Sequence, residues 1–232
     1  LNTSKFYGWK HLVYFPDVGS NVEIVADLIH KLTGKSFNPK ERNVIKDREI
    51  RNSLDWIFQH FHILTKKDVK AKMTPFQFYD YAVELKQKGG LQTASIDSWK
   101  DLSHPYHEFG GYAQYLEVVL PYRNQIAEDN ELHLHTIIHP KLTEKINGKR
   151  SVPSPYDLKG GSEWFNSGKC MITVHREDLN YNQAIINFNK IKPRSAGQIG
   201  QLIMWFDKEK FLYYEQENPA PNVYNKIYAK EK

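Results

Sequence analysis

Hydrophobic residues recur along the chain with two alternating periods. Residues 9–15 form a short apolar run that Pro16 ends, and this run predicts a buried strand. A helix follows, with Ser20 as its N-cap and Gly34 as its stop. Its apolar side chains recur at helical spacing, at Val22, Val25, Ile29 and Leu32. The pattern therefore predicts a strand followed by an amphipathic helix.

The same alternation continues to about residue 138. It predicts helices at residues 50–61, 74–89 and 112–128, and strands at residues 62–64, 91–96 and 132–138. Thr74-Pro75 is typical of a helix start, because threonine caps and proline suits the first helical position. Strands that alternate with helices are typical of a mostly parallel α/β sheet flanked by helices.

The pattern changes in the last third of the chain. Four apolar segments joined by short turns predict antiparallel strands at one side of the sheet: residues 169–174, 184–190, 202–206 and 211–214. Residues 207–210 are charged and predict a hairpin turn. The segments 103–111 and 140–161 predict loops, the second unusually long for a compact domain. Residues 216–232 are a polar tail.

Composition and charge add a few limits. Hydrophobic residues make up 40% and charged residues 25%, so a core can form. No apolar run reaches about 18 residues, so no membrane partner is expected. The single cysteine, Cys170, excludes an internal disulfide and fits the cytoplasm, and its apolar surroundings predict a buried, inert thiol. The net charge of +5 suits a polyanionic partner.

Two aspartates follow predicted strands. Asp97 ends the strand at residues 91–96, and Asp17 follows the first strand. Ligands of open α/β sheets bind at the carboxyl ends of the strands, where an aspartate can hold Mg²⁺ through water. Asp17 would lie beside Asp97 if the two strands are neighbours. The alternatives are a capping role for Asp97 and a simple turn role for Asp17.

Other polar residues also follow strands. His139 could donate a hydrogen bond to a terminal phosphate, although a lone histidine is usually structural. Lys192 and Arg194 stand before a glycine turn, where an arginine could reach the nucleotide of a neighbouring subunit. The alternative is a solvated basic turn. His133 and His135 share a strand face without a third ligand at useful spacing, which argues against a zinc site.

The order of these motifs resembles that of a known family. The motifs are Phe15-Pro16-Asp17, Ile96-Asp97-Ser98-Trp99-Lys100, Ile138-His139-Pro140, residues 154–166, Val174-His175-Arg176 and Lys192-Pro193-Arg194. Between residue 7 and about residue 214 the chain resembles the RecA-like ATPase domain of DnaB-like and Twinkle-like replicative helicases, particularly phage primase-helicases.

The resemblance implies roles for individual residues. Asp17 stands where the family has a glutamate that orients the attacking water, so its side chain is one methylene shorter. Asp97 would be the carboxylate on the Mg²⁺ side of ATP, and His139 the phosphate sensor. Arg194 would be an arginine finger, with Lys192 beside it. The basic residues of the long loop would contact single-stranded DNA: Lys141, Lys145, Lys149 and Arg150.

The resemblance also bears on the whole protein. The family's phosphate loop would lie about 20 to 30 residues before Tyr7, given the usual connecting helix, and residues 1–7 cannot contain it. Residues 1–215 are therefore expected to be a partial ATPase core that binds ATP poorly when alone. The chain is either a fragment of a longer protein, which we favour, or a natural variant that has lost the loop. The expected function is an ATP-driven motor that moves on single-stranded DNA as a homo-hexamer or other ring, in a bacterial cell or phage-infected host.

Two alternatives stay open. The chain could be a non-catalytic assembly or DNA-binding module with a degenerate nucleotide site. It could also be a RecA-type recombinase or clock-like ATPase that shares the sheet. A primase domain upstream is a further implication of the resemblance to primase-helicases.

Overall fold

The computed structural model describes residues 1–18, 20–65, 69, 73–141, 145–146, 149–176, 182–207 and 212–215. The chain divides into two compact units. The first contains residues 1–141 and 155–168, and the second contains residues 142–154 and 169–232. The tail at residues 216–232 and most of the predicted turn at residues 207–210 lie outside the described residues.

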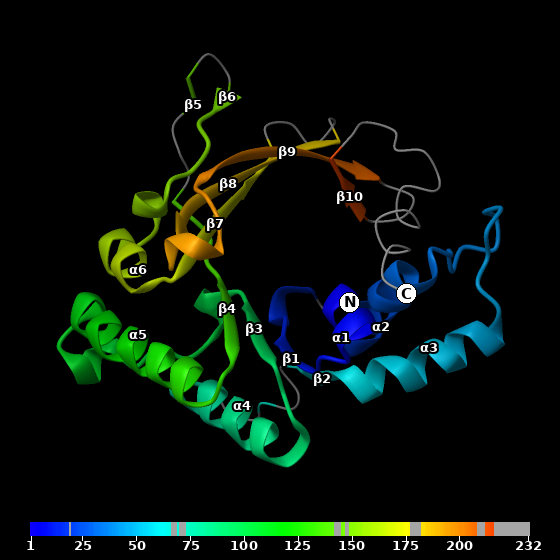
Figure 1. The fold of residues 1–232 in the computed structure, drawn as a ribbon, viewed down its shortest axis with the longest axis horizontal. Helices are drawn as coiled ribbons and strands as arrows, with labels where there is room; N and C mark the ends of the chain where they lie inside the picture. The colour runs from blue at the N-terminus through cyan, green and yellow to red at the C-terminus, as the bar shows by residue number, and fades with distance from the viewer. Residues whose placement is uncertain are drawn as a thin grey trace. The chain divides into compact units, whose positions relative to one another are not determined.

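A four-stranded parallel sheet forms the centre of the first unit (Figure 1). Its order is β2–β1–β3–β4, with β1 at His11–Tyr14, β2 at Phe61–Leu64, β3 at Thr93–Asp97 and β4 at His133–Ile137. The strands start in register, because His11 pairs with both Phe61 and Thr93, and Thr93 pairs with His133. The predicted parallel α/β sheet is confirmed.

The helices of this unit are α1 (Asn2–Tyr7), α2 (Asn21–Thr33), α3 (Asp47–His60), α4 (Pro75–Gly89), α5 (Tyr112–Asp129) and α6 (Gly161–Ser167). Local capping signals mark the ends of α2 and α4. Ser20 and Thr74 form capping boxes with Glu23 and Gln77. Gly34 and Gly90 end α2 and α4 in the left-handed conformation that glycine adopts readily.

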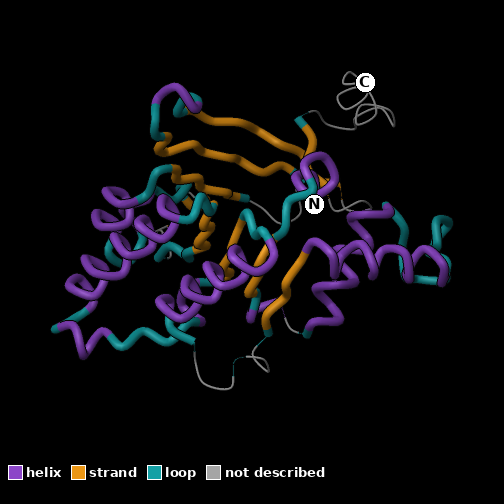
Figure 2. The backbone as a smooth tube through the Cα atoms, turned by 60° about the horizontal axis from the view of Figure 1, so that its bottom comes forward, coloured by secondary structure: helices purple, strands orange, loops and turns teal. Residues whose placement is uncertain are grey.

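The two faces of the parallel sheet bury different helices. Val13 and Phe61 pack with Ile29 of α2 and Ile57 of α3 in one apolar cluster. Alternate strand residues point to opposite faces, so Leu12 and its neighbours on β3 face the other way. On that face α4 and α5 lie side by side beneath the sheet (Figures 1 and 2). Both faces near β1 are therefore buried, as is typical of parallel sheets.

The second unit holds an antiparallel sheet of its own. Its order is β10–β9–β8–β7, with β7 at Cys170–His175, β8 at Gln183–Ile191, β9 at Gly200–Asp207 and β10 at Leu212–Tyr214. The antiparallel strands are confirmed. They pair with one another instead of extending the parallel sheet, because each reverses into its sequence neighbour.

Two expectations need correction. Residues 140–161 are not one unstructured loop, because β5 (Lys145–Ile146) pairs with β6 (Lys149–Arg150) and a 3₁₀ turn, η4, covers Pro155–Asp157. Cys170 is exposed, because side chains alternate along β7 and Cys170 shares an exposed face with Ile172 and Val174. In the part of the chain that the structure describes, no helix is long and apolar enough to span a membrane.

Candidate active site

Three neighbouring strands bring three predicted site residues to one edge of the parallel sheet. Asp97 is the last residue of β3, and Asp17 lies in η1 (Pro16–Val18), just beyond β1. His139 lies two residues beyond β4. Since β1 and β4 both pair with β3 in parallel, all three residues follow the carboxyl ends of adjacent strands. This is the edge where open α/β sheets bind ligands.

The carboxyl group of Asp97 sits in a mixed electrostatic environment. Burial raises the pKa of Asp97 above its usual value, His139 opposes this rise, and the carboxylates of Asp17 and Asp101 add to it. These effects show that His139 and Asp17 are close enough to act on Asp97. A divalent cation bound here would offset both the desolvation and the repulsion between carboxylates.

Lys100 adds a cation that the sequence did not reveal as part of this site. Its Nζ lies 3.1 Å from Asp17 Oδ2, and this hydrogen bond raises the pKa of Lys100. The side chains of Lys100 and Asp17 are 62% and 42% exposed. Water and salt screen such a pair, so a ligand can readily displace it.

The segment after Asp97 is anchored in the core. Ser98 and Trp99 are buried, and the Ser98 hydroxyl donates to Asp101 Oδ2 at 2.8 Å. The Trp99 ring packs edge-on against Trp164 of α6, with centroids 5.0 Å apart. This packing fixes the backbone that carries Asp97 and Lys100.

His104 completes this anchor. Its Nε2 donates to the Trp99 carbonyl at 2.7 Å, since a carbonyl can only accept. Its Nδ1 then accepts the Tyr115 hydroxyl at 3.1 Å. Burial lowers the pKa of His104, which favours the neutral ring that this pattern requires.

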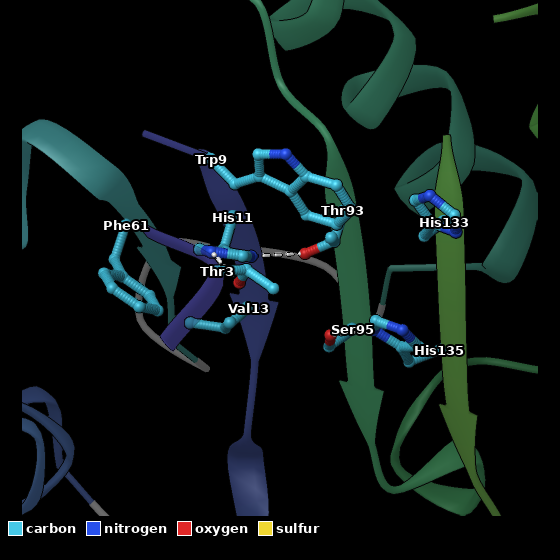
Figure 3. A pocket seen from close by; sticks show the side chains of 9 residues that line it. All are labelled: Thr3, Trp9, His11, Val13, Phe61, Thr93, Ser95, His133 and His135. Atoms are coloured by element: carbon cyan, nitrogen blue, oxygen red, sulfur yellow. Dashed lines mark hydrogen bonds between the residues drawn. The ribbon is translucent and has the colours of Figure 1, made fainter. Parts of the chain in front are cut away.

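A separate cavity of about 280 Å³, lined by polar and apolar side chains, lies over the amino-terminal part of the strands (Figure 3). The His11 side chain lines this cavity and shares hydrogen bonds with Thr93 Oγ1 at 2.6 Å and Ser4 Oγ at 2.8 Å. Ser95 Oγ lies 3.0 Å from His135 Nδ1, and Trp9 stacks on His133. Burial lowers the pKa of His11 to about 4, so its ring is neutral near pH 7.

These contacts bear on the question of a zinc site. Two of the cavity's histidines, His11 and His135, share hydrogen bonds with protein hydroxyls. Across the described part of the chain, no three His, Cys, Asp or Glu side chains are grouped to hold a metal.

The remaining predicted residues lie elsewhere. Lys141 is exposed, and its backbone N–H donates to the Asp157 carbonyl at 2.9 Å. Lys145 lies on β5, and Lys149 and Arg150 lie on β6, but their side chains are outside the described structure. Two more cations, Lys192 and Arg194, are exposed between β8 and β9 in the second unit.

Comparisons with solved structures give strong fold matches. One, described as an ATPase domain, matches with a TM-score of 0.68 and 14% identity, over 90% of this chain and 75% of that one. Another, a DnaB-like replicative helicase studied with its interactions with primase, matches with a TM-score of 0.63 and 14% identity, over 89% of this chain. The chain has the fold of a DnaB-like helicase ATPase domain. It spans about half, 51%, of that DnaB-like helicase.

Sequence comparisons do not extend this result. No protein-family model and no curated protein matches the chain. The DnaB-like fold confirms the predicted RecA-like architecture. At 14% identity it leaves the roles of individual residues to the local geometry.

Proposed function

We propose that the chain forms part of an ATP-driven DNA helicase motor whose nucleotide lies at the carboxyl edge of the parallel sheet. The observation that carries this proposal is the meeting of Asp17, Asp97 and His139 after three adjacent strands of a DnaB-like fold. Two carboxylates and a histidine at this edge suit the chemistry of phosphoryl transfer.

Each residue has a distinct proposed role. Asp97 holds Mg²⁺ through water, because hard cations prefer carboxylate oxygens and the partly desolvated Asp97 gains from a cation. Asp17 orients the attacking water once its ion pair with Lys100 is broken. His139, which follows β4 beside the strand that ends in Asp97, senses the terminal phosphate. ATP supplies the phosphoryl group, and the chain's own residues position the water and the metal ion.

The proposal extends to the assembled protein. Lys192 and Arg194 reach the nucleotide of a neighbouring subunit in a homo-hexamer or other ring. Lys141, Lys145, Lys149 and Arg150 contact the phosphates of single-stranded DNA in the channel. The protein works in the cytoplasm of a bacterial or phage-infected cell, and a primase domain upstream fits the same proposal. Support comes from the DnaB-like fold and from the positive net charge of +5.

ATP hydrolysis by the full-length protein, with and without single-stranded DNA, tests the motor. DNA is expected to stimulate hydrolysis, and Asp97→Asn is expected to abolish the stimulated rate. Asp27→Asn is the matched control, since Asp27 lies on α2 and pairs with Lys31 at 4.0 Å. Hydrolysis that DNA does not stimulate and that Asp97→Asn leaves intact would contradict the proposal.

A second candidate is a non-catalytic assembly or DNA-binding module. The short Asp17 side chain and its ion pair with Lys100 favour this alternative, because neither places a free carboxylate over a nucleotide. Calorimetric titration of the full-length protein with Mg·ATP separates the two. Binding without hydrolysis, or no binding together with retained DNA affinity, would support the module.

A further inference from the structure

An aromatic side chain stands exposed close to the carboxyl end of β4. Tyr156 of η4 is 62% exposed, more than most large side chains of the first unit. Its ring lies 5.2 Å from the ring of Phe165 on α6, at an interplanar angle of 35°. One face of Tyr156 is thus supported by another aromatic ring while much of its surface faces solvent.

The backbone beneath Tyr156 is fixed by close packing. A Cβ atom at Gly161 would lie 2.6 Å from Tyr156 Cα and 2.7 Å from the Pro155 carbonyl oxygen. Only glycine therefore lets η4 sit against the first turn of α6. Because the Tyr156 backbone is already ordered, a ligand that stacks on the ring loses little entropy in ordering it.

One lysine lies beside Tyr156. The backbone of Lys141 is hydrogen-bonded to Asp157, so exposed Lys141 is next to Tyr156 in space although the two are 15 positions apart in sequence. Lys159, three positions after Tyr156, is also exposed, but its Nζ lies over the ring of Tyr112, 4.3 Å from the centroid. The acidic residues of the same stretch are Asp157 and Glu163, and Glu163 accepts the Ser162 hydroxyl.

We propose that Tyr156 is a base-stacking residue for single-stranded DNA, with Lys141 beside it for the adjoining phosphate. This inference rests on the proposed function and names a residue that the motif resemblance does not assign to DNA. Bases stack on aromatic faces without sequence preference, which suits a strand that must slide. A protein partner is disfavoured, because the exposed neighbours are lysines and not an apolar patch of the size that protein docking needs.

Position links this contact to the nucleotide site. Lys141 follows His139 by two residues, and both follow the carboxyl end of β4. A shift of residues 139–141 therefore moves His139, near the phosphate, together with Lys141, near the DNA. The same segment is tied to η4 through Asp157, so Tyr156 moves with it.

Fluorescence anisotropy with a labelled oligothymidylate, and with an abasic strand of equal length, tests the inference on the 232-residue chain. Tyr156→Ala is expected to weaken binding of the oligothymidylate by about 10-fold or more, the loss that follows when a base loses its aromatic partner. Tyr156→Phe keeps the ring and is expected to bind as the unsubstituted chain does. Tyr7→Ala, which removes another exposed tyrosine, is the control.

The abasic strand gives a second readout, the preference for a strand that carries bases. The unsubstituted chain is expected to prefer the strand with bases, and Tyr156→Ala is expected to lose that preference. Equal binding of both strands by the unsubstituted chain, or an unchanged preference in Tyr156→Ala, overturns the role of Tyr156 but leaves the proposed function standing. A chain that binds neither strand overturns the proposed DNA contact as well. Unchanged DNA binding with an altered sedimentation coefficient in Tyr156→Ala would make Tyr156 a protein contact instead.

Discussion

At the scale of single residues, the candidate site depends on side chains that only the fold brings together. Asp17 and Lys100 are 83 positions apart, and no local pattern connects them. From the sequence, Asp17 was expected beside Asp97 if their strands were neighbours, and β1 does pair with β3. The ion pair could not be predicted, since it depends on how η1 and the turn after β3 are oriented.

The length of the Asp17 side chain gives a first prediction. Asp17→Glu restores the missing methylene and is expected to raise the DNA-stimulated rate of ATP hydrolysis by the full-length protein. Asp17→Asn is expected to lower it by about 100-fold or more, the usual contribution of a group that handles the proton of the attacking water. Asp27→Glu serves as the control. Equal rates for Asp17→Glu and Asp17→Asn would remove Asp17 from the mechanism.

His11 gives a prediction about pH. Its pKa is about 4 in the folded chain and 6.5 in an ordinary environment, so between these values the unfolded chain binds more protons. Stability is therefore full above pH 6.5 and falls as the pH drops toward 4, by on the order of 2–3 kcal/mol. Urea unfolding at about pH 7 and about pH 5 measures this loss. His11→Gln should reduce it, and an equal loss in His11→Gln would refute the assignment.

At the scale of elements, local signals decided what could be predicted. Ser20 and Gly34 delimit α2, and Thr74 starts α4, because capping is a property of neighbouring residues. The β5–β6 hairpin was missed although Asn147-Gly148 is a strong hairpin signal. The short helix α6 was also missed, since seven residues with one buried tryptophan show little periodicity.

The contact between η4 and α6 carries a prediction of its own. Gly161→Ala places a Cβ against the backbone of Pro155 and Tyr156, which cannot move as a side chain can. The expected cost is about 1–3 kcal/mol of unfolding free energy, as for other overpacked sites. Gly200→Ala is the matched control, because nothing lies within 4 Å of its added Cβ. Thermal unfolding compares the two, and similar midpoints would show that η4 adjusts freely.

At the scale of the whole molecule, the sequence identified the class of the fold but not its division into two units. The late strands read as an extension of the parallel sheet, because their pattern shows pairing but not where a sheet ends. The exposure of Cys170 follows from the same limit. An apolar run suggests burial, yet Cys170, Ile172 and Val174 lie on an exposed face of β7.

The proposed DNA-binding cations Lys141, Lys145, Lys149 and Arg150 lead to a prediction about the salt dependence of DNA binding. If four cations contact DNA phosphates, the logarithm of the binding constant should fall with the logarithm of salt concentration with a slope of about −3, or about −0.7 per phosphate. Lys145→Ala should reduce the magnitude of the slope by about 0.7. Lys31→Ala on α2 is the control. A slope that Lys145→Ala leaves unchanged would place this lysine off the DNA path.

The first unit is discontinuous in sequence, and this has a consequence for protein engineering. Residues 142–154 leave the unit and residues 155–168 return to it, with Lys141 and Asp157 joined by a 2.9 Å backbone hydrogen bond. A deletion of residues 142–154, closed by a short glycine linker, should therefore keep the unit folded. A truncation after Lys141 should not, because it removes Trp164 from beside Trp99, and losing a buried tryptophan costs about 3–5 kcal/mol. The hairpin is in this sense an insertion, and it can be exchanged without rebuilding the parallel sheet.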